Sequence, residues 1–270
     1  MNDVIQIDFA AFAGKSSIGY GMDINEDYIF IDDQSYGGKA LLACIADGSG
    51  SRNSTFNPAI IVSNHIRENF QWLWKSHKEI VTEHAPEMIE SYYRTANDVL
   101  VAFKLGDEQN RGKYASTLIT AFIEKSGYMT FAHAGNSRMY LIRSQKIMRL
   151  TNDHTDGWKM VKSGKMAEED YYRSTERLSL YNGLGVTKTD FLKIDTGKVR
   201  LMHNDVIIMS TDGLHYAVNQ NYLMNCVMTA NTVEDAAEAM IAGAERLQYR
   251  DNISVNVIWY TGYPEGEDQN

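Results

Sequence analysis

The sequence predicts an α+β fold built in layers, and three observations favour this class. Short apolar segments follow one another through residues 115–150 with only turn residues between them, which is typical of antiparallel strands. The predicted helices come in groups and do not alternate regularly with strands, as a doubly wound parallel sheet would require. Hydrophobic residues make up 44% of the 270 residues, which is enough for a sizeable core.

Strands are expected before the first helix. Residues 4–12 and 27–32 alternate or run apolar, which is the pattern of strands. Residues 40–46 form a compact apolar run that ends at Asp47 and Gly48. This pattern predicts a buried strand that delivers Asp47 to the edge of a sheet.

Two long amphipathic helices are expected next. Pro58 opens the first, because proline is favoured in the first turn of a helix. The second is expected from Pro86 to about Lys104, where apolar residues fall on one stripe. A later helix is expected to begin at Thr232, with Asp235 as a possible capping partner. Such helices are typical of a layer that covers a sheet.

The middle of the chain predicts an antiparallel meander, in which short turns join successive strands. Its strands are expected at residues 118–123, 128–134, 138–143 and 146–150. Residues 151–189 are polar and carry only weak helical patterns. Two further buried strands are expected at residues 206–210 and 253–260, each next to an acidic residue.

One domain is expected over residues 1–262. The chain contains only three prolines, and no stretch rich in Ser, Gly and Pro interrupts it as a linker would. Residues 263–270 are expected to form an acidic tail outside this domain. Cys44 and Cys226 each lie in an apolar segment, so we expect buried reduced thiols and no disulfide between them.

Charge and hydropathy exclude two classes of partner. The formal net charge is −9, from 35 acidic and 26 basic residues, and no basic stripe of the kind that binds nucleic acid is visible. No apolar stretch approaches the roughly 20 residues that span a bilayer, so no membrane partner is expected. The first residues lack the basic start and apolar block of a signal peptide. A cytoplasmic protein is therefore expected.

Four short acidic signatures are the most informative feature of the chain. They are Asn25-Glu26-Asp27, Asp47-Gly48, Asp212-Gly213 and Asp251-Asn252. Acidic residues at the ends of strands, with Gly or Asn beside them, can gather hard oxygen ligands around Mg²⁺ or Mn²⁺. Each signature alone is more often a turn or a solvated edge. All four together, attached to apolar strands, favour a metal site.

A pair of divalent cations would give this chain a hydrolytic chemistry. Two ions roughly 3.5–4 Å apart can bind a phosphate ester, lower the pKa of a bridging water and stabilise an in-line displacement at phosphorus. One carboxylate must bridge both ions, and Asp47 is the best candidate because Gly48 has no Cβ to obstruct close approach of its carbonyl. Structural zinc is not expected without Cys and His clusters. His133 and His154 are expected as hydrogen-bonded structural groups.

As an ordered set, the motifs resemble those of the metal-dependent protein Ser/Thr phosphatases of type 2C, and the compact length resembles the bacterial branch. The similarity is carried by Asn25-Glu26-Asp27, Ala46-Asp47-Gly48-Ser49-Gly50, Ser116-Thr117-Leu118, Gly135-Asn136-Ser137-Arg138, Thr151-Asn152-Asp153-His154, Ser210-Thr211-Asp212-Gly213 and Arg250-Asp251-Asn252. It runs from about Gly14 to Tyr260. The resemblance implies a four-layer α-β-β-α sandwich, in which two antiparallel sheets are flanked by antiparallel helices and the metals lie at one end.

The resemblance also implies the activity and the metal ligands. The expected reaction is hydrolysis of phosphoserine and phosphothreonine in proteins by a water that two Mn²⁺ or Mg²⁺ ions activate. Asp47 would bridge the ions, and the Gly48 carbonyl would join one of them. Asp212 and Asp251 would complete the shell of the first ion. The expected partner is a phosphorylated protein, in signalling that opposes a Ser/Thr kinase, and the protein is expected to be a monomer.

The remaining roles implied by the resemblance lie around the ions. Glu26 would hold the second ion through water, and Asp27 would orient water at the metals, so that both are expected to serve catalysis together with Asp47. Arg138 and Asn252 would fix turns near the site. Residues 155–185 match a flap beside the active site that helps to choose the substrate.

Several residues depart from the family pattern. Met22 stands where the family has an arginine that holds the substrate phosphate, and a thioether cannot make its bidentate bonds. Phosphate binding is therefore expected to be weaker, unless another cation such as Lys15 or Arg52 substitutes. Asn136 and Tyr216 stand where bacterial relatives have two acids that bind a third, weaker ion, so this third site is expected to be lost.

These departures keep alternatives open. A catalytically weak or inactive relative could act as a phosphoprotein-binding regulatory module. Ser49 is a poor general acid at neutral pH and replaces a histidine of the animal members, so a water at the metals would have to protonate the leaving group. A metal-dependent nuclease or small-molecule hydrolase would share the metals, but the chain lacks a basic groove.

Overall fold

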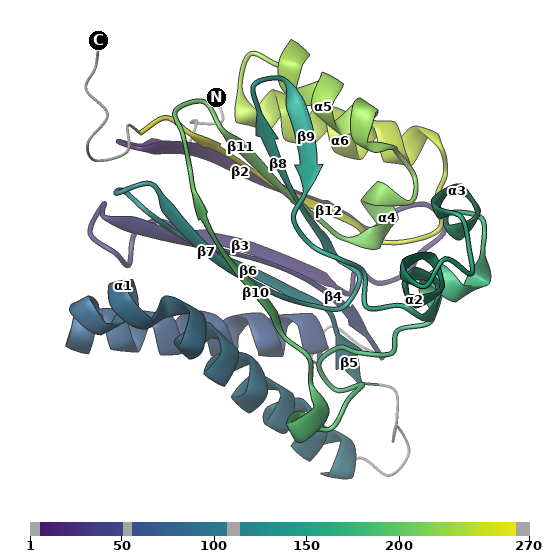
Figure 1. The fold of residues 1–270 in the computed structure, drawn as a ribbon, viewed down its shortest axis with the longest axis horizontal. Coiled ribbons are helices and arrows are strands. Elements are labelled where there is room, and N and C mark those ends of the chain that lie inside the picture. Colours follow the sequence, from purple (N-terminus) through teal and green to yellow (C-terminus); the bar gives the residue numbers. More distant parts are fainter. Residues whose placement is uncertain (1–5, 51–55, 107–113, 263–270) are drawn as a thin grey trace.

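The computed structural model describes residues 6–50, 56–106 and 114–262, and in them two antiparallel sheets lie face to face (Figure 1). The first sheet has the order β1 (Gln6–Ile7), β2 (Ala10–Ser17), β12 (Ile253–Tyr260), β11 (Val206–Ser210), β8 (Arg138–Arg143) and β9 (Lys146–Arg149). The second has the order β10 (Asp195–Arg200), β7 (Tyr128–Ala134), β6 (Leu118–Glu124), β4 (Ala40–Ser49) and β3 (Asp27–Asp32), and β5 (Ala115–Ser116) pairs with β4.

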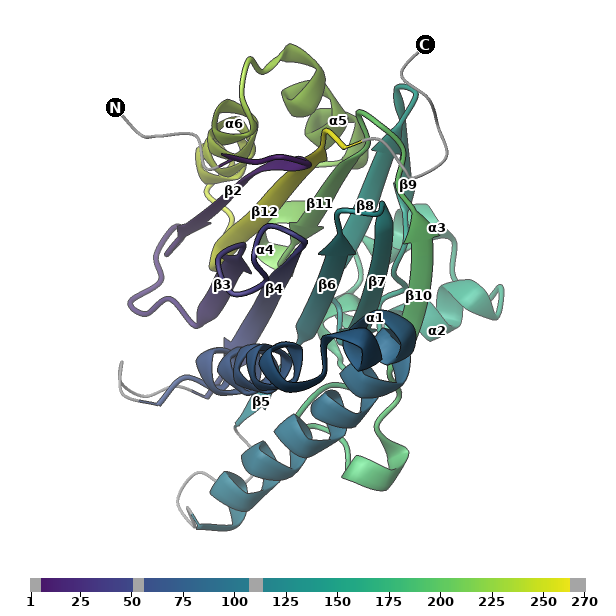
Figure 2. The ribbon, with the colours of Figure 1, turned by 90° about the vertical axis from the view of Figure 1, so that its left-hand side faces the viewer.

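Helices cover the outer face of each sheet, which confirms the predicted α+β class and the four-layer sandwich (Figures 1 and 2). α1 (Pro58–Gly106) lies on the second sheet, and non-helical dihedrals at His77 and His84 break it into successive helical arms, in agreement with the two predicted helices. α5 (Gln220–Thr229) and α6 (Val233–Arg246) lie on the first sheet. The N-cap of α6 is Thr232, as predicted, and its hydroxyl accepts a hydrogen bond from the Asp235 amide.

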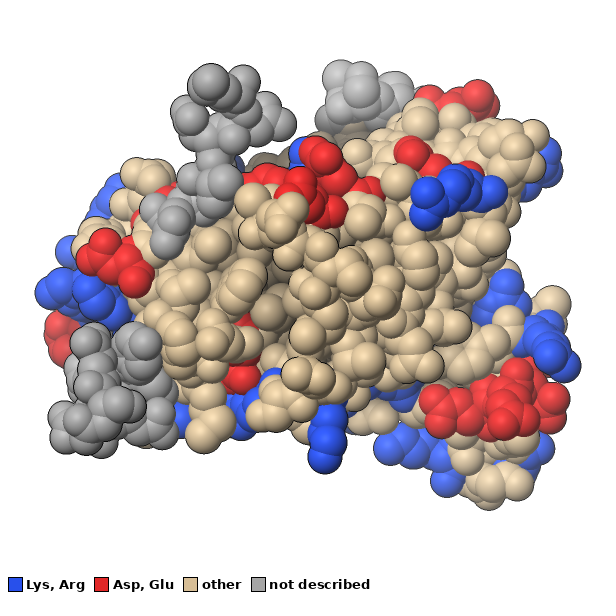
Figure 3. Space-filling view, turned by 90° about the horizontal axis from the view of Figure 1, so that it is seen from above, with Lys and Arg blue, Asp and Glu red and all other residues tan. Residues whose placement is uncertain are grey.

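Short helices and helical turns lie between strands along the chain. They are α2 (Asp156–Lys162), α3 (Glu168–Tyr171), the 3₁₀ turns η1 (Thr175–Leu178) and η2 (Thr189–Phe191), and α4 (Asp212–His215). Among the described residues, none of the helices combines the length and the apolar composition that a membrane span requires. Figure 3 shows the face on the side of α5 and α6, where acidic and basic side chains are interspersed and no broad basic patch gathers among the described residues.

The central strand β4 shows how the apolar run at residues 40–46 is used. Every residue of this run is buried, because one side of the strand faces α1 and the other side faces the opposite sheet. Leu42 and Cys44 pack toward α1, whereas Leu41 and Ile45 pack between the sheets. Both cysteines of the chain are free and buried, as expected. The strand therefore holds its end, where Asp47 lies, in a fixed place.

Two strand predictions were wrong and one strand was missed; of the first prediction, residues 4 and 5 lie outside the described residues. The strand expected at residues 4–12 is split by a turn, and β2 runs on to Ser17 because it pairs with β12 along its whole length despite its polar end. Residues 115–150 form no continuous meander: β7 pairs with β6 and β10, whereas β8 pairs with β9 and β11. The chain changes sheets at Gly135, whose φ of +116° and close approach to Thr117 exclude a side chain. The strand β10 was not predicted.

Candidate metal centre

The four aspartates of the acidic signatures lie close to one another, because the charges of neighbouring members of this group contribute to the raised pKa values of Asp27, Asp47 and Asp251. Asp27 begins β3 directly opposite Asp47 on β4. Asp212 begins α4 after β11, and Asp251 precedes β12, the neighbour of β11. The two sheets thus contribute two carboxylates each. A hydrogen bond of 2.8 Å from Thr211 Oγ1 to Asp27 Oδ2 joins the two pairs.

These four carboxylates lie beside one another without a cationic partner; Asp27 and Asp212 are buried, and Asp47 and Asp251 are partly buried. Burial, followed by the charges of neighbouring acids, raises the pKa of Asp27 to about 7 and that of Asp251 to about 8. The same causes raise the pKa of Asp47 well above its ordinary value, and burial raises the pKa of Asp212. Within the described part of the chain, no Lys, Arg or His forms an ion pair with any of them. Such a donor set fits divalent cations, which would compensate the shared negative charge.

Asn252 ties the loop that carries Glu26 to the segment that carries Asp251. The side-chain amide of Asn252 donates to the carbonyls of Ile18 and Ile24 at 2.8 and 2.9 Å, and its Oδ1 accepts from the Glu26 amide at 2.8 Å. The contact is close, because a Cβ on Gly19 would lie 1.7 Å from the Asp251 carbonyl oxygen. The predicted turn-fixing role of Asn252 is therefore confirmed.

Gly48 is required by the approach of the Glu26 backbone. The Gly48 amide donates to the Glu26 carbonyl at 3.2 Å, and a Cβ on Gly48 would lie 2.9 Å from that oxygen. The Glu26 backbone is thus held from both sides, by Gly48 and by Asn252, and its side chain lies near enough for its charge to raise the pKa of Asp27. The proposed ligand role of the Gly48 carbonyl stays a prediction.

Asn136 supports the centre from behind. Its side-chain amide donates to Asp212 Oδ2 at 2.9 Å, and Asn136 itself is buried. Thr117 performs a similar task for Asp47: its hydroxyl accepts from the Asp47 amide at 3.0 Å and contacts the Ser137 hydroxyl at 2.6 Å. Asn136 therefore adds a hydrogen-bond donor where an acid would add another negative charge.

A buried ion pair lies next to the centre. Arg138 donates to both carboxylate oxygens of Asp153 at 2.9 and 2.6 Å, and both side chains are 1% exposed or less. Burial alone would raise the pKa of Asp153, but Arg138 outweighs it and holds that pKa well below its ordinary value. Arg138 thus has the structural role that the resemblance implied.

The two cations named from the sequence as substitutes for the missing arginine are Lys15 and Arg52. Lys15 forms an ion pair with Glu238 on α6 at 2.8 Å, and Arg52 lies outside the described residues. Arg250 was not considered from the sequence, although it directly precedes Asp251. Its side chain lies beside the loop of Met22, because a Cβ on Gly21 would be 3.6 Å from Arg250 Nε.

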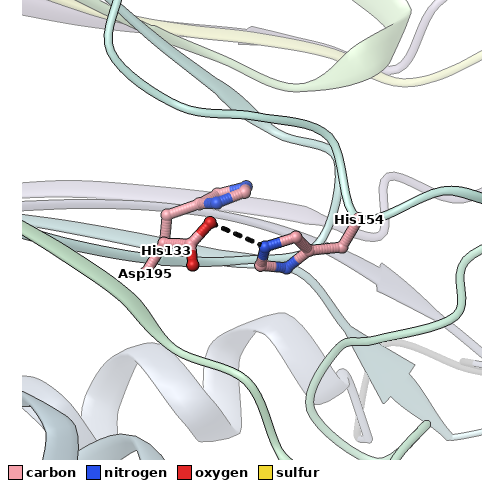
Figure 4. A group of neighbouring side chains, drawn as sticks. All are labelled: His133, His154 and Asp195. Carbon is pink, nitrogen blue, oxygen red and sulfur yellow. Dashed lines mark hydrogen bonds and ion pairs between the residues drawn. The ribbon is translucent and has the colours of Figure 1, made fainter. Parts of the chain in front are cut away.

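His133, His154 and Asp195 form a second cluster with metal-binding side chains (Figure 4). His154 Nδ1 accepts from the Gly135 amide at 3.1 Å and faces the side-chain amide of Asn182 at 2.8 Å. Because Nδ1 faces two donors, the ring proton is on Nε2, which donates to Asp195 at 3.0 Å and has no lone pair left for a metal. His154 is hydrogen-bonded, as predicted, but neither ring nitrogen of His133 has a hydrogen-bond partner among the described residues.

The fold and the acidic centre together define a metal-dependent phosphatase of the two-sheet sandwich type. A family model described as Protein phosphatase 2C matches residues 13–248, and the chain belongs to this family. It is 23% identical over 231 residues to the serine/threonine phosphatase stp of Listeria welshimeri, covering 84% of this chain and 87% of that protein. It is 23% identical over 246 residues to protein phosphatase PhpP of Streptococcus pneumoniae, covering 90% of this chain and 94% of the relative.

Solved structures show the same fold. A crystal structure of a bacterial serine phosphatase superimposes with a TM-score of 0.83 at 20% identity, covering 95% of this chain and 99% of the other. The catalytic domain of the serine/threonine phosphatase PstP, in complex with two manganese ions, superimposes with a TM-score of 0.77 at 19% identity, covering 93% of this chain and 98% of the other.

Proposed function

We propose that this chain removes phosphate from phosphoserine and phosphothreonine in proteins, using two divalent cations at the acidic centre. The observation that carries the proposal is the gathering of four buried or partly buried carboxylates, drawn from both sheets, without a cationic side chain to neutralise them. Mn²⁺ is the first cation to test, because the PstP domain of similar fold was solved with two manganese ions. Mg²⁺ is the second, since it prefers the same oxygen ligands.

The proposed ligands are those that the family resemblance implies, and the closeness of the aspartates supports them. Asp47 would bridge the two ions, with Asp212 and Asp251 on the first ion and Glu26 on the second, together with the Gly48 carbonyl. Bound there, the ions would polarise the phosphoryl oxygens and lower the pKa of a water.

The chain's own groups would position the reactants. Asp27, held by the Thr211 hydroxyl at 2.8 Å, would orient the attacking water. Asn136 would keep the Asp212 carboxylate oriented through its hydrogen bond of 2.9 Å. With Met22 in the place of the usual arginine, Arg250 beside that loop is the cation that the geometry offers for the substrate phosphate.

A third ion is not part of the proposal. Asn136 donates a hydrogen to Asp212, and Tyr216 carries a neutral phenol, so neither residue adds the charge that a further cation needs. We further propose one domain over residues 1–262, with residues 155–185 as the flap, and a cytoplasmic monomer that opposes a Ser/Thr kinase. The acidic tail would lie outside that domain.

The test is release of phosphate from a phosphothreonine peptide. Added Mn²⁺ should produce turnover and EDTA should abolish it. Asp212→Asn should lower kcat/KM by more than about 100-fold, because even the outer partners of metal ligands are worth 10- to 100-fold. The control is Asp8→Asn, an exposed acid that pairs with exposed Lys125 outside the centre and the flap. Full activity in Asp212→Asn would refute the ligand set, and failure to release phosphate with any divalent cation would refute the activity.

A further inference from the structure

Tyr216 links the metal centre to the flap, residues 155–185. It directly follows α4, the turn that Asp212 begins, and its amide donates to the Asp212 carbonyl at 2.9 Å. One helical turn therefore separates a carboxylate of the centre from the Tyr216 ring. A displacement of this ring would move the backbone of Asp212.

The outer part of the flap, residues 159–181, has few buried side chains to anchor it. From residue 159 to residue 181, only Tyr171 is fully buried, and the other described side chains are exposed or half-exposed. The Tyr171 ring packs against Gly157, where a Cβ would come within 2.9 Å of it, and against Trp158 at 5.3 Å between centroids. Tyr171 therefore determines how the outer part of the flap sits on the molecule.

The hydroxyl of Tyr216 contacts the hydroxyl of Tyr171. It lies 3.0 Å from the Tyr171 hydroxyl and 3.1 Å from the Arg177 carbonyl, both of which belong to the flap. Tyr171 donates its own proton to the Asp153 carboxylate at 2.6 Å and also lies 3.1 Å from the Thr155 hydroxyl, so the Tyr216 proton is available to the two flap oxygens. Both contacts of the Tyr216 hydroxyl are made only while the flap stays docked.

Two guanidinium groups also hold the Tyr216 ring. Arg138 lies 5.5 Å from its centroid, and Arg177 of the flap lies 5.2 Å from it. Such stacking contributes to docking but does not depend on the hydroxyl. The hydroxyl can thus be removed while the ring stays in place.

We propose that Tyr216 is a positioning residue that docks the flap onto the turn bearing Asp212. A neutral hydroxyl then fixes the flap without a metal ion, at the position where the family pattern has an acid. The proposal rests on the proposed phosphatase function for its consequence, which is the position of the substrate protein beside the metals. The docking itself can be measured without turnover.

The test is hydrogen exchange of the flap in the full chain. Tyr216→Phe removes one hydroxyl and keeps the ring, so exchange of the amides at residues 168–179 should accelerate roughly 3- to 10-fold, the value of one hydrogen bond. The matched control is Tyr222→Phe, which removes a hydroxyl that donates to the Ala239 carbonyl at 3.0 Å, away from the flap. Equal flap exchange in the two variants would overturn the proposal.

A double-mutant cycle and kinetics sharpen the result. If the two hydroxyls act as one anchor, Tyr171→Phe with Tyr216→Phe should accelerate exchange by less than the product of the single effects. If the acceleration in the double variant equalled the product of the two single accelerations, the shared anchor would be contradicted. In turnover, KM for a phosphothreonine peptide should rise more than KM for p-nitrophenyl phosphate, which is too small to need the flap. Altered exchange without any turnover in the parent chain would reject the phosphatase function and keep the docking role.

Discussion

The acidic centre and the Arg138–Asp153 pair are neighbours, yet the pKa values of their carboxylates are shifted in opposite directions. Asp47 is surrounded by other acids, and its pKa is raised. Asp153 is even less exposed to water, but Arg138 donates to both of its oxygens and its pKa is lowered. The difference lies in the partner, because burial alone would raise the pKa of both carboxylates.

This contrast separates a site built for a ligand from a site built for the fold. A buried carboxylate with its own guanidinium has its charge compensated within the chain, and removing either partner leaves an isolated charge. The carboxylates of a group without such a partner repel one another, so bound protons or a cation from solution stabilise them. Asp47, Asp212 and Asp251, which are predicted metal ligands, fall in the second group.

The largest expected effect is on the compensated site. Asp153→Asn should destabilise the protein by about 3–5 kcal/mol, because it leaves the Arg138 guanidinium buried without a counter-charge. Urea unfolding at pH 7 measures the change. The control is Asp8→Asn, whose exposed pair with Lys125 at 3.3 Å should contribute nothing measurable.

A double variant tests the reason for that loss. Arg138→Met with Asp153→Leu removes both charges and should recover much of the stability lost in Asp153→Asn. If the single variant were as stable as the parent chain, the pair would not be the structural element that distinguishes the two regions.

The next effect has the opposite sign. Asp47→Asn should raise the stability of the metal-free protein at pH 8 by about 1–2 kcal/mol, because it removes one of several repelling charges, as substitutions at strained sites often do. Calorimetry in EDTA measures this gain. Added Mn²⁺ should stabilise the parent chain by about 2.7 kcal/mol at 100 times its dissociation constant, and the variant by much less. A loss of stability in EDTA would show that Asp47 is held by contacts that the comparison has overlooked.

The sequence could predict the acids of the centre because each is attached to a strong local signal. Asp47 follows an uninterrupted apolar run, and such a run must be a buried strand whose end is fixed. Asn252 and Arg138 were assigned to turns through the resemblance, and their hydrogen bonds agree. The order of the motifs along the chain carried the rest of the fold.

The parts that could not be predicted depend on contacts between distant residues. The change of sheet at Gly135 looks like an ordinary hairpin turn locally, and only pairing of β8 with β11 shows otherwise. The sequence indicates only that Tyr216 replaces an acid, because nothing near it in sequence points to Tyr171 or Arg177 as its hydrogen-bond partners. The unpartnered state of His133 likewise follows from the arrangement of β7, β10 and a loop.

His133 extends the comparison to a buried base, whose pKa is lowered by burial. Burial, and then the neighbouring His154, lower the pKa of His133 to about 3, so the folded protein keeps this ring neutral. An unfolded histidine binds a proton below about pH 6.5. Between these values the unfolded state binds more protons, so His133 makes stability fall as pH falls from about 6.5 toward 3.

His133→Gln should remove that contribution and lower the slope of unfolding free energy against pH by about 1.4 kcal/mol per unit between pH 6 and 4. Urea unfolding in EDTA at several pH values measures the slope, and His77→Gln, at an exposed position, serves as the matched control. The carboxylates of the acidic centre act in the opposite direction over this range, because their raised pKa values stabilise the metal-free protein as pH falls. They are common to both variants and cancel in the difference. Equal slopes in the two variants would mean that His133 finds a proton acceptor in the folded protein, and it would then belong with the compensated site.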